Sequence, residues 1–213
     1  MKVIDIINLV AKLIDEIDVK KCVDFCLKNN LTLTQLFNLP TTLQQDEELE
    51  TLLAPSYLTD NCKNIISTIL DALNIATVLV ATEYKPLFKI EYITVENNEF
   101  LIDNFSQKLF KIKEITLNNV KQKYEIIDDK LCLKSGSYKV KYSYIPLEVS
   151  FDDNIHSFNG LSIITMAYLV CSQYCLIKCS FDESSMWQQK FEYALLNNVK
   201  PIKNITLKQR RWF

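Results

Sequence analysis

The chain has 213 residues, of which 48% are hydrophobic and 23% are charged, so it can build a core and is not a largely disordered protein. The 24 basic and 26 acidic residues give a formal net charge of -2, which argues against a domain that holds nucleic acid by electrostatic attraction. Seven cysteines, an odd number placed outside short turn-rich loops, favour reduced thiols in a cytosolic setting over a secreted disulfide scaffold.

Residues 1–85 are predicted to form a helical half of the molecule. Apolar residues recur at helical spacing in residues 3–17, and Thr32 is placed to open a short helix before Pro40. The acidic residues of the first segment, together with the lack of a small-residue cleavage site, argue against a signal peptide. Residues 57–84 are predicted to be a long helix, although the β-branched residues near its end also fit a strand.

Residues 86–149 are predicted to be an antiparallel β unit inserted between two helical halves. At Pro86 the hydrophobic period changes from about 3.6 to 2, and short alternating segments follow until Pro146. Polar residue pairs separate these segments at hairpin spacing. The pairs are Asn97-Asn98, Asn118-Asn119, Asp128-Asp129 and Ser135-Gly136.

Residues 150–200 are predicted to complete the helical part with two further helices. The first, within residues 157–179, is apolar on nearly every side, so we expect it to be buried all round, in a core or against other subunits. Its apolar run, Leu161 to Ile177, is shorter than the roughly 20 residues that a membrane span needs and is interrupted by polar residues. The second helix carries Trp187 and Phe191 on its buried side. The expected class is therefore α+β, with a helical bundle formed by the N- and C-terminal halves.

The sequence contains no recognisable catalytic or metal-binding motif. Cys171, Cys175 and Cys179 form a stripe along a predicted helix, but three thiols on one rigid helix span too far to share an ion, so core packing is the expected role. His156 is the only histidine and lies in a polar connector, away from cysteines that all look buried. With only two glycines, no phosphate-binding loop can be drawn. We expect no catalytic residues, no metal and no cofactor.

The C-terminal tail, residues 201–213, is predicted to be an interaction segment. It ends in Arg210, Arg211, Trp212 and Phe213, and its two arginines are the only ones in the chain. Arginine and tryptophan are typical anchors of protein interfaces, so we favour docking onto a partner. A frayed terminus and a nucleic-acid contact are the alternatives.

The order of these parts resembles the head–tail connector proteins of tailed bacteriophages, the adaptor or tail-tubular class that forms a ring in the phage neck. The resemblance covers roughly residues 86–213, and the N-terminal helices fit only in type. It rests on three short motifs, on the Asp-rich connector before the first C-terminal helix, and on the helix with Trp187 and Phe191 after an acidic cap. The motifs are V-x-Y-x-Y-x-P (Val140, Tyr142, Tyr144, Pro146), A-Y-x-V-x-x-x-Y-C (Ala167, Tyr168, Val170, Tyr174, Cys175) and the terminal R-R-W (Arg210, Arg211, Trp212).

The resemblance implies a non-enzymatic virion protein that assembles in the cytoplasm of the bacterial host. Such proteins form rings, often dodecameric, that join the capsid portal to the tail and surround the DNA channel. The implied partners are further copies of the chain, the portal protein and other neck or tail proteins. DNA would pass without specific binding, and no membrane is involved. The alternatives are a cytosolic thiol- or metal-dependent protein that uses the cysteine stripe, and a monomeric adaptor with one protein partner.

Overall fold

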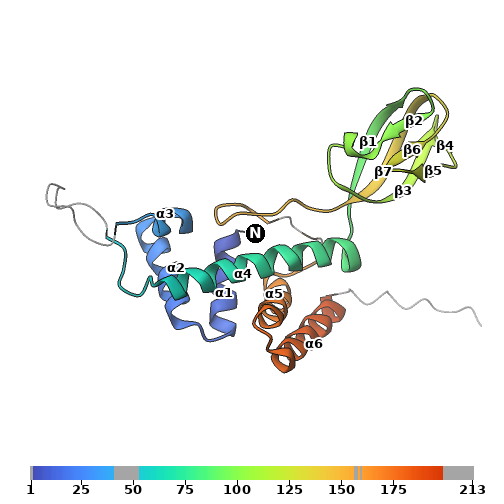
Figure 1. The fold of residues 1–213 in the computed structure, drawn as a ribbon. Coiled ribbons are helices and arrows are strands. Elements are labelled where there is room, and N and C mark those ends of the chain that lie inside the picture. Colours follow the sequence, from blue (N-terminus) through green and yellow to red (C-terminus); the bar gives the residue numbers. More distant parts are fainter. Residues whose placement is uncertain (1, 41–52, 156–157, 159, 199–213) are drawn as a thin grey trace, which may run out of the picture.

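The computed structural model describes residues 2–40, 53–155, 158 and 160–198, and it shows an α+β protein (Figure 1). Within these residues lie helices α1 to α6 and strands β1 to β7, and every strand pair is antiparallel. All seven strands come between α4 and α5 in the chain. The predicted α+β class is confirmed.

The first helical stretch consists of α1 (Val3–Leu13), α2 (Ile17–Asn29) and α3 (Leu33–Phe37). The side chain of Thr32 accepts a hydrogen bond from the backbone N–H of Gln35, whose own side chain accepts one from the N–H of Thr32. This reciprocal capping box satisfies two backbone donors at the start of α3. The predicted helix start at Thr32 is therefore confirmed.

Helix α4 (Asp60–Leu79) continues through a π-helical turn, η1 (Val80–Tyr84), so the strand alternative for its end is wrong. Its side chains Ile66, Ile69 and Leu73 are fully buried against α1, α2 and α5. The helix spanning Asp60–Tyr84 is long and apolar enough to cross a membrane, with a mean hydropathy of 1.8, yet half of that window is buried within the protein.

The strands form two sheets. One has the order β1 (Leu87–Val95), β7 (Gly136–Tyr144), β3 (Leu109–Leu117), β4 (Val120–Lys121). The other has the order β2 (Glu99–Leu101), β6 (Lys130–Cys132), β5 (Glu125–Ile127). A short 3-10 turn, η2 (Ile102–Asn104), follows β2.

Three predicted turns have the backbone that tight hairpins require. Each of these turns is formed by two Asn or two Asp residues, and both residues have φ between 47° and 65°. This is the left-handed conformation of type I′ turns, which asparagine and aspartate adopt more readily than most residues. These are the pairs at 97–98, 118–119 and 128–129. These three polar pairs therefore mark tight turns. The fourth predicted pair, Ser135-Gly136, joins β6 to β7, which lie in different sheets and form no hairpin.

A segment after β7 returns along the helices toward α1. Asn74 of α4 holds it with two hydrogen bonds, because its side-chain N–H donates to the carbonyl of Val149 and its oxygen accepts from the Val149 N–H. Farther along, the N–H of Val3 donates to the carbonyl of Asp153 over 3.3 Å. The return segment is thus fastened to both α4 and the start of α1.

Helices α5 (Ile163–Ile177) and α6 (Phe181–Asn198) pack against each other, and α5 also packs on α1 and α4. Ser162 caps α5 by accepting from the N–H of Thr165. In α6, Trp187 and Phe191 are buried as predicted. The expectation that the first of these helices is buried all round is wrong at its ends, because Ile163, Ile164, Leu176 and Ile177 are 36–45% exposed. Neighbouring helices reach only the middle of α5.

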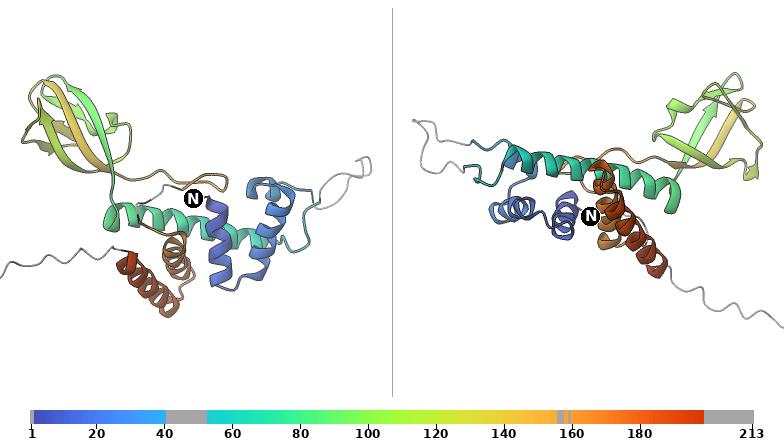
Figure 2. Two further views of the ribbon diagram at one scale, coloured as in Figure 1. Left: turned by 180° about the vertical axis from the view of Figure 1, so that it is seen from behind. Right: turned by 60° about the horizontal axis from the view of Figure 1, so that its bottom comes forward.

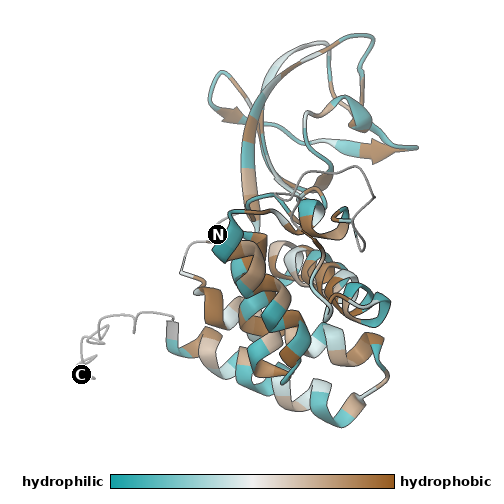
Figure 3. Ribbon diagram, turned by 90° about the vertical axis from the view of Figure 1, so that its left-hand side faces the viewer, coloured by the Kyte–Doolittle hydropathy of each residue, from teal (hydrophilic) through white to brown (hydrophobic). Residues whose placement is uncertain are grey.

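The buried side chains fall into two groups. One fills the space among α1 to α6, and the other lies between the two sheets. Brown hydrophobic and teal hydrophilic residues lie side by side on the helices in Figure 3, as on amphipathic helices with one buried side. The two further views place the strands on one side of α4 and α6 on the other (Figure 2).

Candidate interaction surfaces

The tail residues singled out in the sequence, Arg210, Arg211, Trp212 and Phe213, lie outside the described residues, as does His156. Tail docking therefore stays a prediction. The remaining candidates are the cysteines, the hollows of the surface, and the exposed apolar side chains.

The cysteine stripe does not lie on one buried helix face. Cys171 and Cys175 are buried in α5, whereas Cys179 is exposed after the helix has ended, with a left-handed φ of 60°. Cys132 in β6 is half-buried, so the expectation that all cysteines are buried is wrong for these two. Among the described residues, no cluster of three or more His, Cys, Asp or Glu could hold a metal ion.

Cys22, Cys171 and Cys175 are held in their protonated form. Burial raises the pKa of Cys171 to about 12, and burial followed by the charge of Glu183 raises that of Cys175 to about 11. Cys22 of α2 and Cys62 of α4 meet with their Sγ atoms 3.3 Å apart, and this hydrogen bond, together with burial, raises the pKa of Cys22. A nucleophilic cysteine needs both a lowered pKa and access. Cys22, Cys171 and Cys175 have raised pKa values, and Cys62, whose pKa is lowered by its hydrogen bond with Cys22, is buried.

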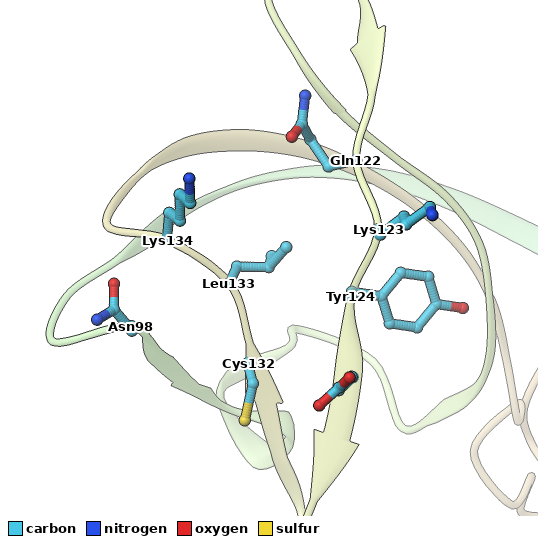
Figure 4. Close-up of a pocket in the computed structure, with 8 residues that line it drawn as sticks. Asn98, Gln122, Lys123, Tyr124, Cys132, Leu133 and Lys134 are labelled. Atoms are coloured by element: carbon cyan, nitrogen blue, oxygen red, sulfur yellow. The ribbon is translucent and has the colours of Figure 1, made fainter.

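The largest of the hollows described here lies in the β part and is shown in Figure 4. Its volume is about 790 Å³, and its lining includes Asn98, Tyr124, Cys132 and Lys134. The Asn98 side-chain oxygen is already engaged by the N–H of Ser135, and the ring of Tyr124 points away from Cys132 (Figure 4). These side chains do not converge on a common point at which a reacting atom could bind.

A polar cluster joins β1 to the loop before β3. The hydroxyls of Tyr142 and Ser106 both donate to one carboxylate oxygen of Glu91, over 2.7 and 2.8 Å, and Lys89 donates to the Ser106 hydroxyl. The Ser106 hydroxyl thus sits between a cation and a carboxylate and borders none of the hollows described here. The cluster fastens the loop to the sheet.

The outer sheet face, defined here as the side of β1, β7 and β3 turned away from the β2–β6–β5 sheet, is both aromatic and basic. Phe88, Ile90 and Tyr92 alternate along β1 and are 48%, 50% and 77% exposed. Lysines from β7 and β3 stand beside them, and two ammonium groups lie over the Phe88 ring at 5.4 and 5.7 Å. The charged residues of this face are Lys111, Lys113, Lys139, Lys141 and Glu114.

Two shallow hollows mark this face. The one nearer the helices, about 490 Å³, is lined by Phe88, Phe110 and Lys113 together with Thr82 of η1. The other, about 330 Å³, is lined by Ile90, Lys139 and neighbouring residues of β3. A face of exposed rings, a hollowed surface and four lysines against one glutamate fits an apolar partner that carries negative charge.

The outer α6 face, defined as Asp182, Met186, Gln189, Tyr193 and Leu196, is another surface with exposed apolar side chains. These residues recur every three or four positions on the side opposite the buried Trp187 and Phe191. Tyr193 and Leu196 are each 71% exposed. Glu192 borders the face on one side, and Lys190 on the other side lies over the Trp187 ring at 3.9 Å.

Neither surface was predicted from the sequence. Alternation in β1 was visible, but it does not tell which of the two faces of a strand meets a core. For α6, the sequence feature that could have indicated an exposed apolar face is the position of Tyr193 and Leu196 outside the predicted buried stripe.

The chain matches no protein-family model. No curated protein sequence matches it at a significant level.

Proposed function

We propose that the chain is a non-enzymatic structural protein that forms an oligomeric ring in the neck of a tailed bacteriophage. In this proposal the ring joins the capsid portal to the tail and surrounds the DNA channel. The chain would assemble in the host cytoplasm and remain in the virion. The proposal rests on the sequence resemblance and on the surfaces described above.

The proposed architecture is a helical bundle formed by residues 1–85 and 150–200, with an antiparallel β unit, residues 86–149, inserted between them. The packing of α5 on α1 and α4 supports a bundle built from both ends of the chain. The separate buried cluster between the sheets supports a β unit with its own core. Residues 201–213 would be an interaction tail.

The observation that carries the proposal is the pair of exposed apolar faces on opposite sides of α4, one on α6 and one on the sheet (Figure 1). Side chains such as Tyr92, Tyr193 and Leu196, each more than two thirds exposed, contribute little apolar burial to a monomer. Exposed apolar patches of this kind mark interaction sites. Two different faces per chain allow each copy to contact two neighbours, which is what a ring requires. The formal net charge of -2 suits a channel that passes DNA without retaining it.

A thiol- or metal-dependent protein is the rival. It is disfavoured by the burial and raised pKa values of Cys171 and Cys175. A monomeric adaptor that binds one partner through the outer sheet face is the second rival, and the exposed rings of that face support it. The two binding proposals differ in assembly state.

The test compares the full chain with a variant that lacks residues 208–213. Because the two buried clusters are built from residues up to 195, we expect the truncated protein to keep the circular dichroism and melting temperature of the full chain. We expect its assembly into rings or onto portal-bearing particles to weaken, as measured by light scattering and electron microscopy. Unchanged assembly of the truncated protein would show that the tail is not an anchor.

A further inference from the structure

We infer that the outer sheet face of one copy receives the outer α6 face of a second copy. This inference rests on the proposed ring and names the two surfaces that would build it. The occupant of the sheet face is therefore the chain itself, and the contact pairs two different surfaces.

The two faces cannot meet within one chain. Helix α6 is held to the helical core by Trp187 and Phe191, and the hydroxyl of Ser172 in α5 donates to the backbone carbonyl of Ser184 in α6 over 3.1 Å. The strands lie on the other side of α4 from α6 (Figures 1 and 2). Only a second molecule can bring an α6 to the outer sheet face.

The faces match in length and in apolar character. An α-helix of 18 residues, the length of α6, is about 27 Å long, and a strand of 9 residues, the length of β1, is about 30 Å long. The apolar residues of α6 form one line along the helix axis, and those of β1 form one line along the strand. Met186, Tyr193 and Leu196 can therefore pack along the row of Phe88, Ile90 and Tyr92.

The charges of the two faces are of opposite sign. The outer sheet face carries four lysines, and its one carboxylate, Glu114, is already paired with Lys121 over 3.2 Å. The α6 face carries Asp182, with Glu192 beside it, and the ammonium of Lys190 is turned over the Trp187 ring. Such complementarity sets the orientation in which two surfaces meet and disfavours contact between like faces.

A sheet-to-helix contact is heterologous, so every copy keeps one free face of each kind after binding a neighbour. Repetition of one heterologous contact gives a closed ring when the rotation closes and a filament when it does not. A dimer would need both faces of one copy to contact the same neighbour, and the position of the strands and α6 on opposite sides of α4 disfavours this. The inferred contact thus predicts assembly beyond a dimer.

The experiment uses two full-length charge-reversal variants. The sheet variant carries Lys139→Glu with Lys141→Glu, and the helix variant carries Asp182→Lys with Glu192→Lys. Each variant alone would place like charges at every contact, so its self-association should weaken by about tenfold or more. In an equimolar mixture, each contact between a sheet variant and a helix variant again joins faces of opposite charge. The mixture should therefore assemble.

A matched control reverses two lysines elsewhere on the β part, as Lys123→Glu with Lys134→Glu. Both lysines are exposed and border the hollow of Figure 4, away from the outer sheet face. The control changes the net charge as much as the sheet variant does. Circular dichroism confirms the fold of each protein, and sedimentation velocity at low and moderate salt measures the assembly.

Weak assembly of each reversal variant, restored in the mixture and unaffected in the control, is the expected result. Assembly of both variants like that of the unmodified chain would overturn the inferred contact and leave the ring intact. The inferred contact would also be overturned if the equimolar mixture did not assemble. It would be overturned too if the sheet variant assembled normally and lost only the binding of an acidic peptide or of single-stranded DNA. An unmodified chain that never associates, alone or on portal-bearing particles, would overturn both the contact and the proposed function.

Discussion

Glu91 lies on the inner face of β1. Its neighbours Ile90 and Tyr92 are exposed, because successive residues of a strand point to opposite faces. Burial opposes the charge of its carboxylate, but hydrogen bonds from Tyr142 and Ser106 outweigh that effect and lower its pKa. The pKa of Tyr142 is raised to about 12 by burial and by its bond to Glu91. The pair gives the Glu91 carboxylate a partner on the inner face of β1, which also carries the buried Ile93 and Val95.

We predict that Tyr142→Phe lowers the free energy of unfolding at pH 7 by about 1 kcal/mol, because the carboxylate loses its buried donor. The pKa of Glu91 is lowered in the folded state, so its contribution is complete above the ordinary carboxyl pKa and is lost as the pH falls through the lowered value. The difference between the two proteins should therefore shrink in acid, as measured by urea unfolding at several pH values.

Tyr92→Phe is the matched control, since Tyr92 is 77% exposed on the same strand. It should change stability by less than about 0.5 kcal/mol at any pH. A Tyr142→Phe effect that stays constant through the acid range would mean that Glu91 does not depend on this donor.

We also predict that Cys179 and Cys132 react first with a thiol reagent at pH 8, because they are exposed and half-buried respectively. Cys26, Cys171 and Cys175 should react slowly, since burial raises each of their pKa values to about 11 or 12. Mass spectrometry of timed samples gives the order, and protein unfolded in guanidinium shows that all seven can react. Fast labelling of Cys175 would favour the alternative that the chain is a thiol-dependent protein.

At the scale of elements, the return segment depends on one side chain of α4. Asn74→Ala should cost about 1–3 kcal/mol of stability, because the N–H and the carbonyl of Val149 both lose their partner. Hydrogen exchange should accelerate at the Val149 amide more than within α4 itself. Asn64→Ala, on an exposed position of the same helix, is the control and should be close to neutral. Equal exchange rates at Val149 in both variants would contradict this role.

The helices and turns could be predicted because their signals are local. Thr32 with Gln35, and the polar pairs at 97–98, 118–119 and 128–129, fix backbone geometry within a few residues. The order of the strands could not be predicted, because β7 lies between β1 and β3 through pairings distant in the sequence. The exposure of Ile163 and Ile177 likewise depends on how far the neighbouring helices reach along α5.

At the scale of the whole molecule, the sequence shows no catalytic or metal motif and favours assembly. It indicates the C-terminal tail as the surface that contacts a partner. Which apolar residues remain uncovered is decided by packing across the chain, as Tyr92 and Leu196 show. The tail, the outer sheet face and the outer α6 face together would give each copy enough contacts for two neighbours in a ring. The separate cores of the helices and the strands would let one neighbour's helix dock on the strands of the next.

The most direct test of this account is the mass of the full chain in solution over a range of concentrations, alone and with portal-bearing particles, by light scattering with electron microscopy of the same samples. We predict a closed ring larger than a dimer, formed alone or on the portal. A strict monomer at every concentration, with no ring on any particle, would contradict the account.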